Sequence, residues 1–266
     1  MENLVIIKLG GSTITDKTSN IPKANYAVLE RLAKEIAEAY KKMDSQLIII
    51  HGAGSYGHQI VKRTGINNGI KRKEQIIAFA ETQRLQNELN SIVAKILIDA
   101  GLPAIPIQAS SSAVMKSGKL IEMNTTVIKG LLEMGMIPIL YGVPAYDTVQ
   151  KCSILSGDEI APYLALQLNA KKIIHATNVD GIFTEDPYLS ENAKMIPLIT
   201  KDNFEEVKKS LSGSACVDVT GGMLNKVIQV IEIAKKGVEI LFVNALIEGN
   251  VKRVLLGERI GTLIKW

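Results

Sequence analysis

The sequence predicts an α/β protein whose mostly parallel sheet is covered by helices on both faces. Short runs of β-branched and aliphatic residues alternate with longer segments of helical periodicity, which is the pattern of successive strand–helix–strand units. The composition agrees, because 47% of the 266 residues are hydrophobic while only 5% are aromatic. A core built from Ile, Leu, Val and Ala is typical of buried parallel sheets.

Strands and helices are expected to alternate along the chain. The strands are expected at 4–7, 47–50, 104–107, 137–141, 172–176 and 239–243. The helices are expected at 24–42, 73–100, 124–134, 158–168 and 223–236. A glycine stop follows the helix at 73–100 and the helix at 223–236. The segment 142–156 interrupts this alternation and is expected to be a β-hairpin or a loop.

Composition and charge exclude several classes of protein. The chain is too hydrophobic to be disordered, and no apolar run approaches the roughly 20 residues that cross a bilayer. The apolar stretch at 4–7 is too short for a signal peptide, and two cysteines, Cys152 and Cys216, make neither a disulfide framework nor a zinc site. We therefore expect a cytoplasmic protein. A net charge of +4 does not indicate nucleic-acid binding and fits an acidic small-molecule substrate.

Glycine and polar residues gather at strand ends and at one helix start, where parallel sheets bind their ligands. Four segments carry them: 8–12 (KLGGS), 51–58 (HGAGSYGH), 177–181 (TNVDG) and 218–223 (DVTGGM). Glycine lets the backbone approach a phosphate, and a helix N-terminus favours an anion. Lys8 and Lys226 add full positive charges. The set predicts a site that holds two phosphorylated groups face to face.

Each segment taken alone has a structural alternative. Gly10-Gly11 and Asp180-Gly181 could form plain turns, and Asp158 could cap a helix. The glycine-rich segment after the second strand lacks the Lys-Ser/Thr of a P-loop and the downstream acidic residue of a Rossmann fingerprint. We expect His175 to be a core residue. His58 closes a glycine-rich loop at a helix start and is expected to be functional.

The order of these motifs across nearly the whole chain resembles the amino acid kinase superfamily. Within it, the segment 51–58, Thr15-Asp16-Lys17 and Leu89-Asn90 are similar to the isopentenyl phosphate kinases, with fosfomycin kinase as a close relative. The resemblance implies a three-layer αβα sandwich with a mostly parallel central sheet of about eight strands. It also implies a single domain over 1–266, with an acceptor-binding half over about 1–160 and a nucleotide-binding half over about 161–266. Members of this family commonly form homodimers.

The reaction that the resemblance implies is transfer of the γ-phosphoryl group from ATP, with Mg²⁺, to isopentenyl phosphate, giving isopentenyl diphosphate for isoprenoid biosynthesis. Catalytic roles fall to five charged or ionisable residues: Lys8, Lys17, His58, Asp158 and Lys226. The lysines would neutralise the phosphates, and Asp158 would orient them. His58 would hydrogen-bond the acceptor phosphate. No protein metal-ligand cluster, no nucleic acid and no membrane partner is expected.

The resemblance also implies two sets of binding residues. The nucleotide and the transferring phosphoryl group would contact Gly10, Gly11, Thr177, Asp180, Gly181, Gly222, Met223 and Lys226. The acceptor would contact Gly54, Ser55, His58, Phe79, Thr82, Ile154 and Gly157. Structural alternatives remain for two of these, because Phe79 could be ordinary core and Thr82 a threonine bonded to its own helix backbone.

Three departures from the family pattern concern the acceptor and the nucleotide turn. Val143 stands where many isopentenyl phosphate kinases have Asp after Tyr-Gly, Asn178 stands where Asp is commoner, and Thr82 is more polar than the usual pocket residue. They leave open a kinase for another small phosphate or phosphonate such as fosfomycin. A uridylate kinase fits less well. So does a non-catalytic nucleotide-binding module, because the charged residues of the site are all present.

Overall fold

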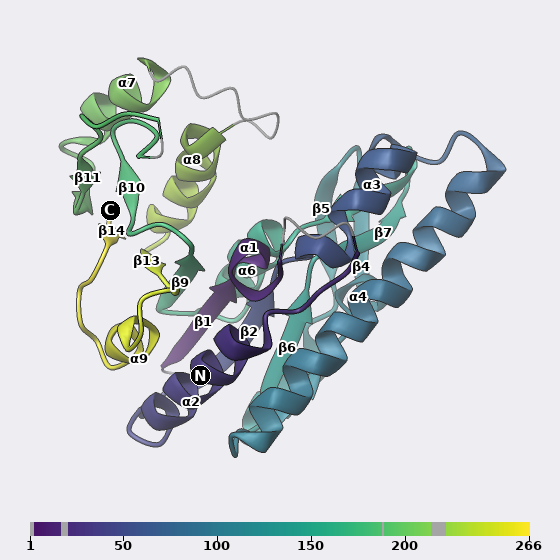
Figure 1. Ribbon diagram of the computed structural model, residues 1–266, viewed down its shortest axis with the longest axis horizontal. Coiled ribbons are helices and arrows are strands. Elements are labelled where there is room, and N and C mark those ends of the chain that lie inside the picture. The colour runs from purple at the N-terminus through teal and green to yellow at the C-terminus, as the bar shows by residue number, and fades with distance from the viewer. Residues whose placement is uncertain (1–2, 17–20, 188, 214–221) are drawn as a thin grey trace.

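Eight strands form the central sheet within the residues that the structure describes. The computed structural model describes residues 3–16, 21–187, 189–213 and 222–266. In sheet order the strands are β12 (Leu198–Ile199), β14 (Thr262–Ile264), β13 (Glu239–Asn244), β9 (Lys172–Thr177), β1 (Leu4–Leu9), β2 (Gln46–His51), β6 (Ile137–Tyr141) and β3 (Ala104–Pro106). All neighbours are parallel except β13 and β14. The predicted α/β class is confirmed (Figure 1).

Helices cover both faces of this sheet and bury two separate apolar cores. One face carries α2 (Tyr26–Tyr40), α4 (Lys73–Asp99) and α9 (Asn250–Leu255). The other carries α5 (Thr126–Glu133), α6 (Gly157–Gln167), α7 (Phe204–Gly213) and α8 (Gly222–Ala234). Although α4 runs for 27 residues, none of the described helices has an apolar stretch that could cross a membrane.

A second, four-stranded sheet stands beside the main one in the order β5-β4-β7-β8. Its strands are β4 (Ala113–Lys116), β5 (Lys119–Met123), β7 (Val143–Asp147) and β8 (Lys151–Leu155). The hairpin expected within 142–156 is confirmed as β7–β8, which pair antiparallel. The β4–β5 hairpin was not predicted. A two-stranded ribbon of β10 (Ile182–Phe183) and β11 (Met195–Ile196) completes the strands.

Asp147 fixes the β7–β8 hairpin from inside the protein. Its carboxylate is fully buried and accepts backbone N–H groups at 2.8–3.1 Å from Ser117, Gly118, Val149 and Gln150, as well as the Ser153 hydroxyl. Burial alone would raise the pKa of Asp147, but these donors stabilise the charged form and hold its pKa well below the usual range. One carboxylate therefore joins the turn of β4–β5 to the turn of β7–β8.

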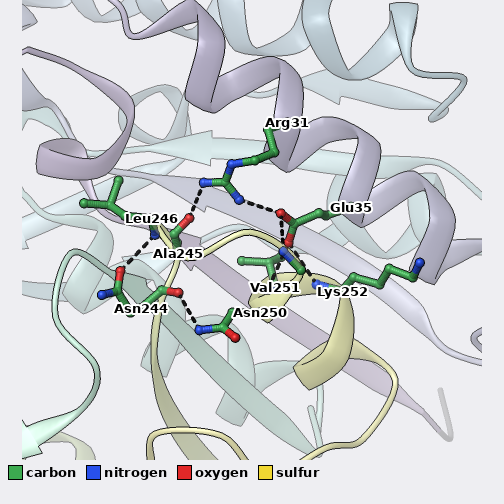
Figure 2. Close-up of polar contacts among 9 residues, drawn as sticks. Arg31, Glu35, Asn244, Ala245, Leu246, Asn250, Val251 and Lys252 are labelled. Carbon is green, nitrogen blue, oxygen red and sulfur yellow. Dashed lines mark hydrogen bonds and ion pairs between the residues drawn. The ribbon is translucent and has the colours of Figure 1, made fainter.

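A second buried carboxylate joins the two ends of the chain (Figure 2). Glu35 on α2 accepts backbone N–H groups from Gly249 at 2.9 Å and Val251 at 3.1 Å, at the N-terminus of α9. Arg31, one turn earlier, pairs with Glu35 and donates to the Ala245 carbonyl oxygen at 2.6 Å. The chain between β13 and α9 is thereby tied to a helix from the opposite end of the sequence.

Candidate active site

The carboxyl ends of β1, β2 and β9 border a cavity of about 270 Å³. Its walls come from the turn after β1, the turn after β2, the start of α6 and the turn after β9. The first three belong to the expected acceptor half and the last to the expected nucleotide half. Parallel strands bring their carboxyl ends to one edge, so residues far apart in sequence meet there.

Lys8 and Asp158 form an ion pair in the wall of this cavity. Lys8 Nζ lies 2.9 Å from Asp158 Oδ1, and the two side chains are 12% and 32% exposed. Asp158 lies in the first turn of α6, whose N-cap is Ser156, so the positive end of the helix favours its charge. The expected pairing of a strand lysine with this aspartate is present in the geometry. Asp158 is not the N-cap itself.

His175 lies next to this pair in the core, in register with Lys8 on the neighbouring strand. It is 3% exposed and stacks on Phe242 with ring centroids 4.6 Å apart. Its Nδ1 is 3.7 Å from Asp158 Oδ1. The expectation of a core histidine agrees with this burial, although the ring also contacts the site carboxylate.

The two glycine turns pack directly on one another. A Cβ added to Gly11 would lie 2.5 Å from the Gly54 nitrogen, and one added to Gly52 would lie 2.6 Å from the Gly11 nitrogen. Gly54 also has a positive φ of 51°. The Gly10 nitrogen donates to the Ala176 carbonyl oxygen at 2.8 Å. These glycines are thus required for loop packing as well as for any approach of a phosphate.

Two residues of the turn after β2 that were predicted to contact the phosphoryl acceptor, Gly54 and Ser55, instead contact other parts of the protein. The Ser55 N–H donates to Thr15 Oγ1 at 3.0 Å, and the Ser55 hydroxyl contacts the Lys23 backbone. Gly54 is buried, and neither residue lines the cavity among the described residues. His58, at the first position of α3 (His58–Thr64), does line it, together with Gly57.

His51, the first residue of the same motif, is structural. It is fully buried, stacks on Tyr141 at 5.4 Å, and its Nε2 lies 3.2 Å from Asn90 Oδ1. Burial lowers the pKa of His51 to about 4, so the ring is neutral at physiological pH.

The turn after β9 closes the cavity from the expected nucleotide side. Ser12 Oγ donates to Asn178 Oδ1 at 3.4 Å and joins this turn to the one after β1. Thr177 lines the cavity, and its hydroxyl is bonded within the turn to the Val179 carbonyl oxygen at 2.9 Å. Asp180 accepts from Asn244 Nδ2 at 2.8 Å. A Cβ on Gly181 would lie 2.6 Å from Thr262 Oγ1, so close packing explains that glycine.

Three of the residues predicted to contact the acceptor line the cavity: Thr82 on α4, Ile154 on β8 and Gly157 at the start of α6. Thr82 donates its hydroxyl to the Ala78 carbonyl oxygen at 2.7 Å. The hydroxyl hydrogen is therefore used within the helix. Phe79 is half-buried and packs against the cluster that includes Ile154, and it is not among the described residues that line the cavity.

Several predicted residues cannot be placed. Lys17 lies outside the described residues, as do the surroundings of Gly222, Met223 and Lys226 at the start of α8. Their assignments remain predictions.

Gln86 is a cavity residue that was not predicted. It lies four residues after Thr82 on α4 and is fully buried. The sequence did carry a sign of this residue. Gln86 is a polar amide on the helix face that also carries the buried Leu85, Leu89 and Val93, where an apolar residue would be expected.

The ligands available in this cavity suit a metal ion that is bound mainly by the phosphates of the substrates. Among the described residues, no group of three or more His, Cys, Asp or Glu side chains could hold a metal ion. Mg²⁺ usually binds through one or two carboxylates together with substrate phosphates, and Asp158 supplies a carboxylate in the cavity.

Comparison with known proteins finds relatives that match nearly the whole chain. Residues 3–244 match the model of the amino acid kinase family. The chain is 37% identical to the isopentenyl phosphate kinase of Methanothermobacter thermautotrophicus and 36% identical to that of Methanocaldococcus jannaschii, each match covering 98% of both chains. A solved isopentenyl phosphate kinase structure superposes with a TM-score of 0.85 at 34% identity, covering 99% of this chain and 100% of the other.

Proposed function

Because the chain belongs to the amino acid kinase family, and within it to the isopentenyl phosphate kinases, we propose that it transfers the γ-phosphoryl group of ATP to isopentenyl phosphate. The products are isopentenyl diphosphate and ADP. The observation that carries the proposal is one cavity in which the Lys8–Asp158 pair lies between turns of the acceptor and nucleotide halves. Such a cavity lets two phosphorylated molecules meet at a single lysine.

The main task of this site is electrostatic. The acceptor is already an anion, so its attack on the γ-phosphoryl group needs no general base. Two unit charges about 4 Å apart repel by about 4 kcal/mol at an effective dielectric constant of 20, which would slow the reaction by orders of magnitude. Lys8 opposes this repulsion, and Asp158 holds the ammonium group in place at 2.9 Å.

The glycine turns and His58 position the two substrates. The turn at Gly10–Gly11 lies against the transferring phosphoryl group, and His58 donates to the acceptor phosphate from the start of α3. Gly157 brings the start of α6 to the same place. The apolar side chains Val61 and Ile154 receive the hydrocarbon tail.

The nucleotide half supplies the opposite wall. Thr177 shapes the turn through its hydroxyl, and Asp180 fixes that turn through Asn244. By family resemblance alone, Lys17 and Lys226 are assigned to the nucleotide phosphates, and Gly222 and Met223 to the wall of the nucleotide pocket. When bound, Mg²⁺ neutralises part of the phosphate charge.

The apolar end of the cavity favours isopentenyl phosphate over a polar acceptor such as fosfomycin. The hydroxyl hydrogen of Thr82 is bonded within its helix, and Val143 and Pro144 add apolar surface to the wall. The Val143 departure therefore makes the pocket more apolar.

A coupled ADP-release assay tests the proposal. It compares isopentenyl phosphate, dimethylallyl phosphate, longer prenyl phosphates, fosfomycin and UMP. We expect isopentenyl phosphate to be among the best acceptors by kcat/KM. A clear preference for fosfomycin or UMP would contradict the proposal, and the absence of turnover with every acceptor would favour a non-catalytic module.

The proposal extends to the organisation of the protein. The chain acts as a single domain with two functional halves, as a cytoplasmic homodimer. Sedimentation equilibrium of the purified protein tests the assembly, and a mass near 28.9 kDa, that of one chain, would contradict it.

A further inference from the structure

Gln86 carries an amide that makes no hydrogen bond to any other residue that the structure describes. It is fully buried on α4, and neither its Nε2 nor its Oε1 has a partner among the described residues. A buried polar group without a partner destabilises a fold, and most such groups in native proteins are satisfied. Gln86 lines the cavity, so a ligand there can satisfy its amide.

The amide lies at the phosphate end of the acceptor pocket. Gln86 Nε2 occupies the space that a side chain at position 57 would need, 2.4 Å from a Cβ built on Gly57. Gly57 immediately precedes His58, and both line the cavity. Because neither end of the amide is bonded to another described residue, its NH₂ group is available to an anion beside His58.

We propose that Gln86 positions the acceptor by donating a hydrogen bond from Nε2 to an oxygen of its phosphate group, next to His58. This inference rests on the proposed function, which places the acceptor phosphate at His58. The tail then extends toward Val61 and Ile154, which line the same cavity. A neutral amide adds a directional bond without adding charge to a site that already contains Lys8.

Two isosteric variants test the contact. The Kd of isopentenyl phosphate is measured calorimetrically in the presence of a non-hydrolysable ATP analogue. Gln86→Met removes the donor, and we expect the Kd to rise about 10- to 100-fold, the usual effect of losing a hydrogen bond to a charged group. Gln86→Glu places a negative charge beside the phosphate and is expected to weaken binding further than Gln86→Met does. The KM for ATP should change less than threefold.

Thermal unfolding of the ligand-free protein separates this role from a structural one. Gln86→Met removes an unsatisfied polar group, so its Tm should equal or exceed that of the wild type. Gln83→Met is the matched control, because Gln83 Nε2 is already bonded to Ser110 Oγ and the Pro144 carbonyl oxygen, each at 3.0 Å. This control should lower the Tm and leave the acceptor Kd unchanged.

The outcomes distinguish the two proposals. If the wild type binds the acceptor and Gln86→Met binds it equally well, the Gln86 contact is wrong and the proposed function stands. A lowered Tm for Gln86→Met with an unchanged Kd also overturns the contact. If the wild type binds the ATP analogue and no isopentenyl phosphate, the proposed function itself fails.

Discussion

At the scale of single residues, Lys8 is the group whose loss should affect turnover most. It lies between the two halves of the cavity, with Nζ held 2.9 Å from Asp158. We expect Lys8→Ala to lower kcat by about 10²–10³-fold, as for the removal of one group that stabilises transition-state charge. The ADP-release assay measures this, and a kcat within threefold of the wild type would remove Lys8 from the mechanism.

His58 should act mainly on the acceptor. It lines the cavity from the start of α3, in the expected acceptor half of the chain. We expect His58→Ala to raise the acceptor Kd by about tenfold or more, since it loses a bond to a charged group, with little effect on the Kd of ATP. Titration of each substrate separately measures both constants. Equal acceptor affinities in the wild type and the variant would show that His58 is not in the site.

The sequence predicted which charged and ionisable side chains line the cavity better than it predicted which hydrogen-bond donors face it. Lys8 is the penultimate residue of β1, and His58 and Asp158 lie in the first turns of α3 and α6, so the topology alone brings them to one edge of the sheet. The Ser55 N–H was expected at the acceptor, yet it bonds Thr15 Oγ1 across the folded loops. Which donors stay free depends on long-range packing, and for that reason Gln86 was missed as well.

At the scale of elements, the contact between the two glycine turns can be tested by adding one methyl group. In Gly11→Ala, the new Cβ would lie 2.5 Å from the Gly54 nitrogen and 3.2 Å from the Gly52 carbonyl carbon. Because backbone atoms cannot yield as a side chain can, we expect a loss of about 2 kcal/mol in the free energy of unfolding and a large loss of kcat.

Gly130→Ala is the control for this variant. A Cβ at position 130, inside α5, has no heavy atom within 4 Å, so this change should stabilise the protein by about 0.5–1 kcal/mol. Urea unfolding of both variants measures the difference. An equal stability of the two would contradict the close approach of the turns.

The β7–β8 hairpin depends on a charged Asp147. Asp147→Asn replaces an acceptor of five hydrogen bonds with a neutral amide, and we expect it to cost about 2 kcal/mol at pH 7. The pKa of Asp147 is lowered by folding, so its stabilisation is complete above the unfolded pKa of about 4 and is lost progressively as the pH falls below that value.

Urea unfolding across pH measures this dependence. The stability gap between the wild type and Asp147→Asn should be constant above about pH 5 and shrink below about pH 4. A gap that stays constant down to pH 2.5 would contradict the role of the charge.

Runs of aliphatic residues decided which strands were predictable, since even the three-residue β3 was expected at 104–107. The strands with long aliphatic runs, such as β2 and β9, were predicted almost to the residue. The strands β4 and β5 have four and five residues, with a register shift between Val114 and Met115. β4 pairs with β5 along its length and with β7 at Met115, and no local sequence pattern reveals these partners.

At the scale of the whole molecule, the alternation of strands and helices was enough to predict the class and the parallel sheet. It did not predict the far edge, where β14 has three residues and runs antiparallel to β13, or the six-residue α9. These elements are held by contacts between distant parts of the chain. The tie between Arg31, Glu35 and the start of α9 is one of them (Figure 2).

This tie connects α2 to the nucleotide half, so its loss should affect stability and ATP binding together. Glu35→Ala leaves Arg31 and the N-terminal N–H groups of α9 without their acceptor, and we expect a loss of about 3 kcal/mol in the free energy of unfolding. The substitution frees the loop that begins after Asn244, and the Asn244 side chain donates a hydrogen bond to Asp180 in the turn after β9. The KM for ATP should therefore rise more than the acceptor KM.

An exposed ion pair between α9 and the residues that follow it provides the comparison for Glu35→Ala. Arg253 and Glu258 are about half exposed, so Arg253→Ala should change the stability by less than about 0.5 kcal/mol and leave both KM values unaltered. Urea unfolding and steady-state kinetics of the two variants measure these effects. If Glu35→Ala raises both KM values equally, the tie only stabilises the fold. If it raises the KM for ATP alone, a contact at the opposite end of the sequence positions the turn that carries Asp180.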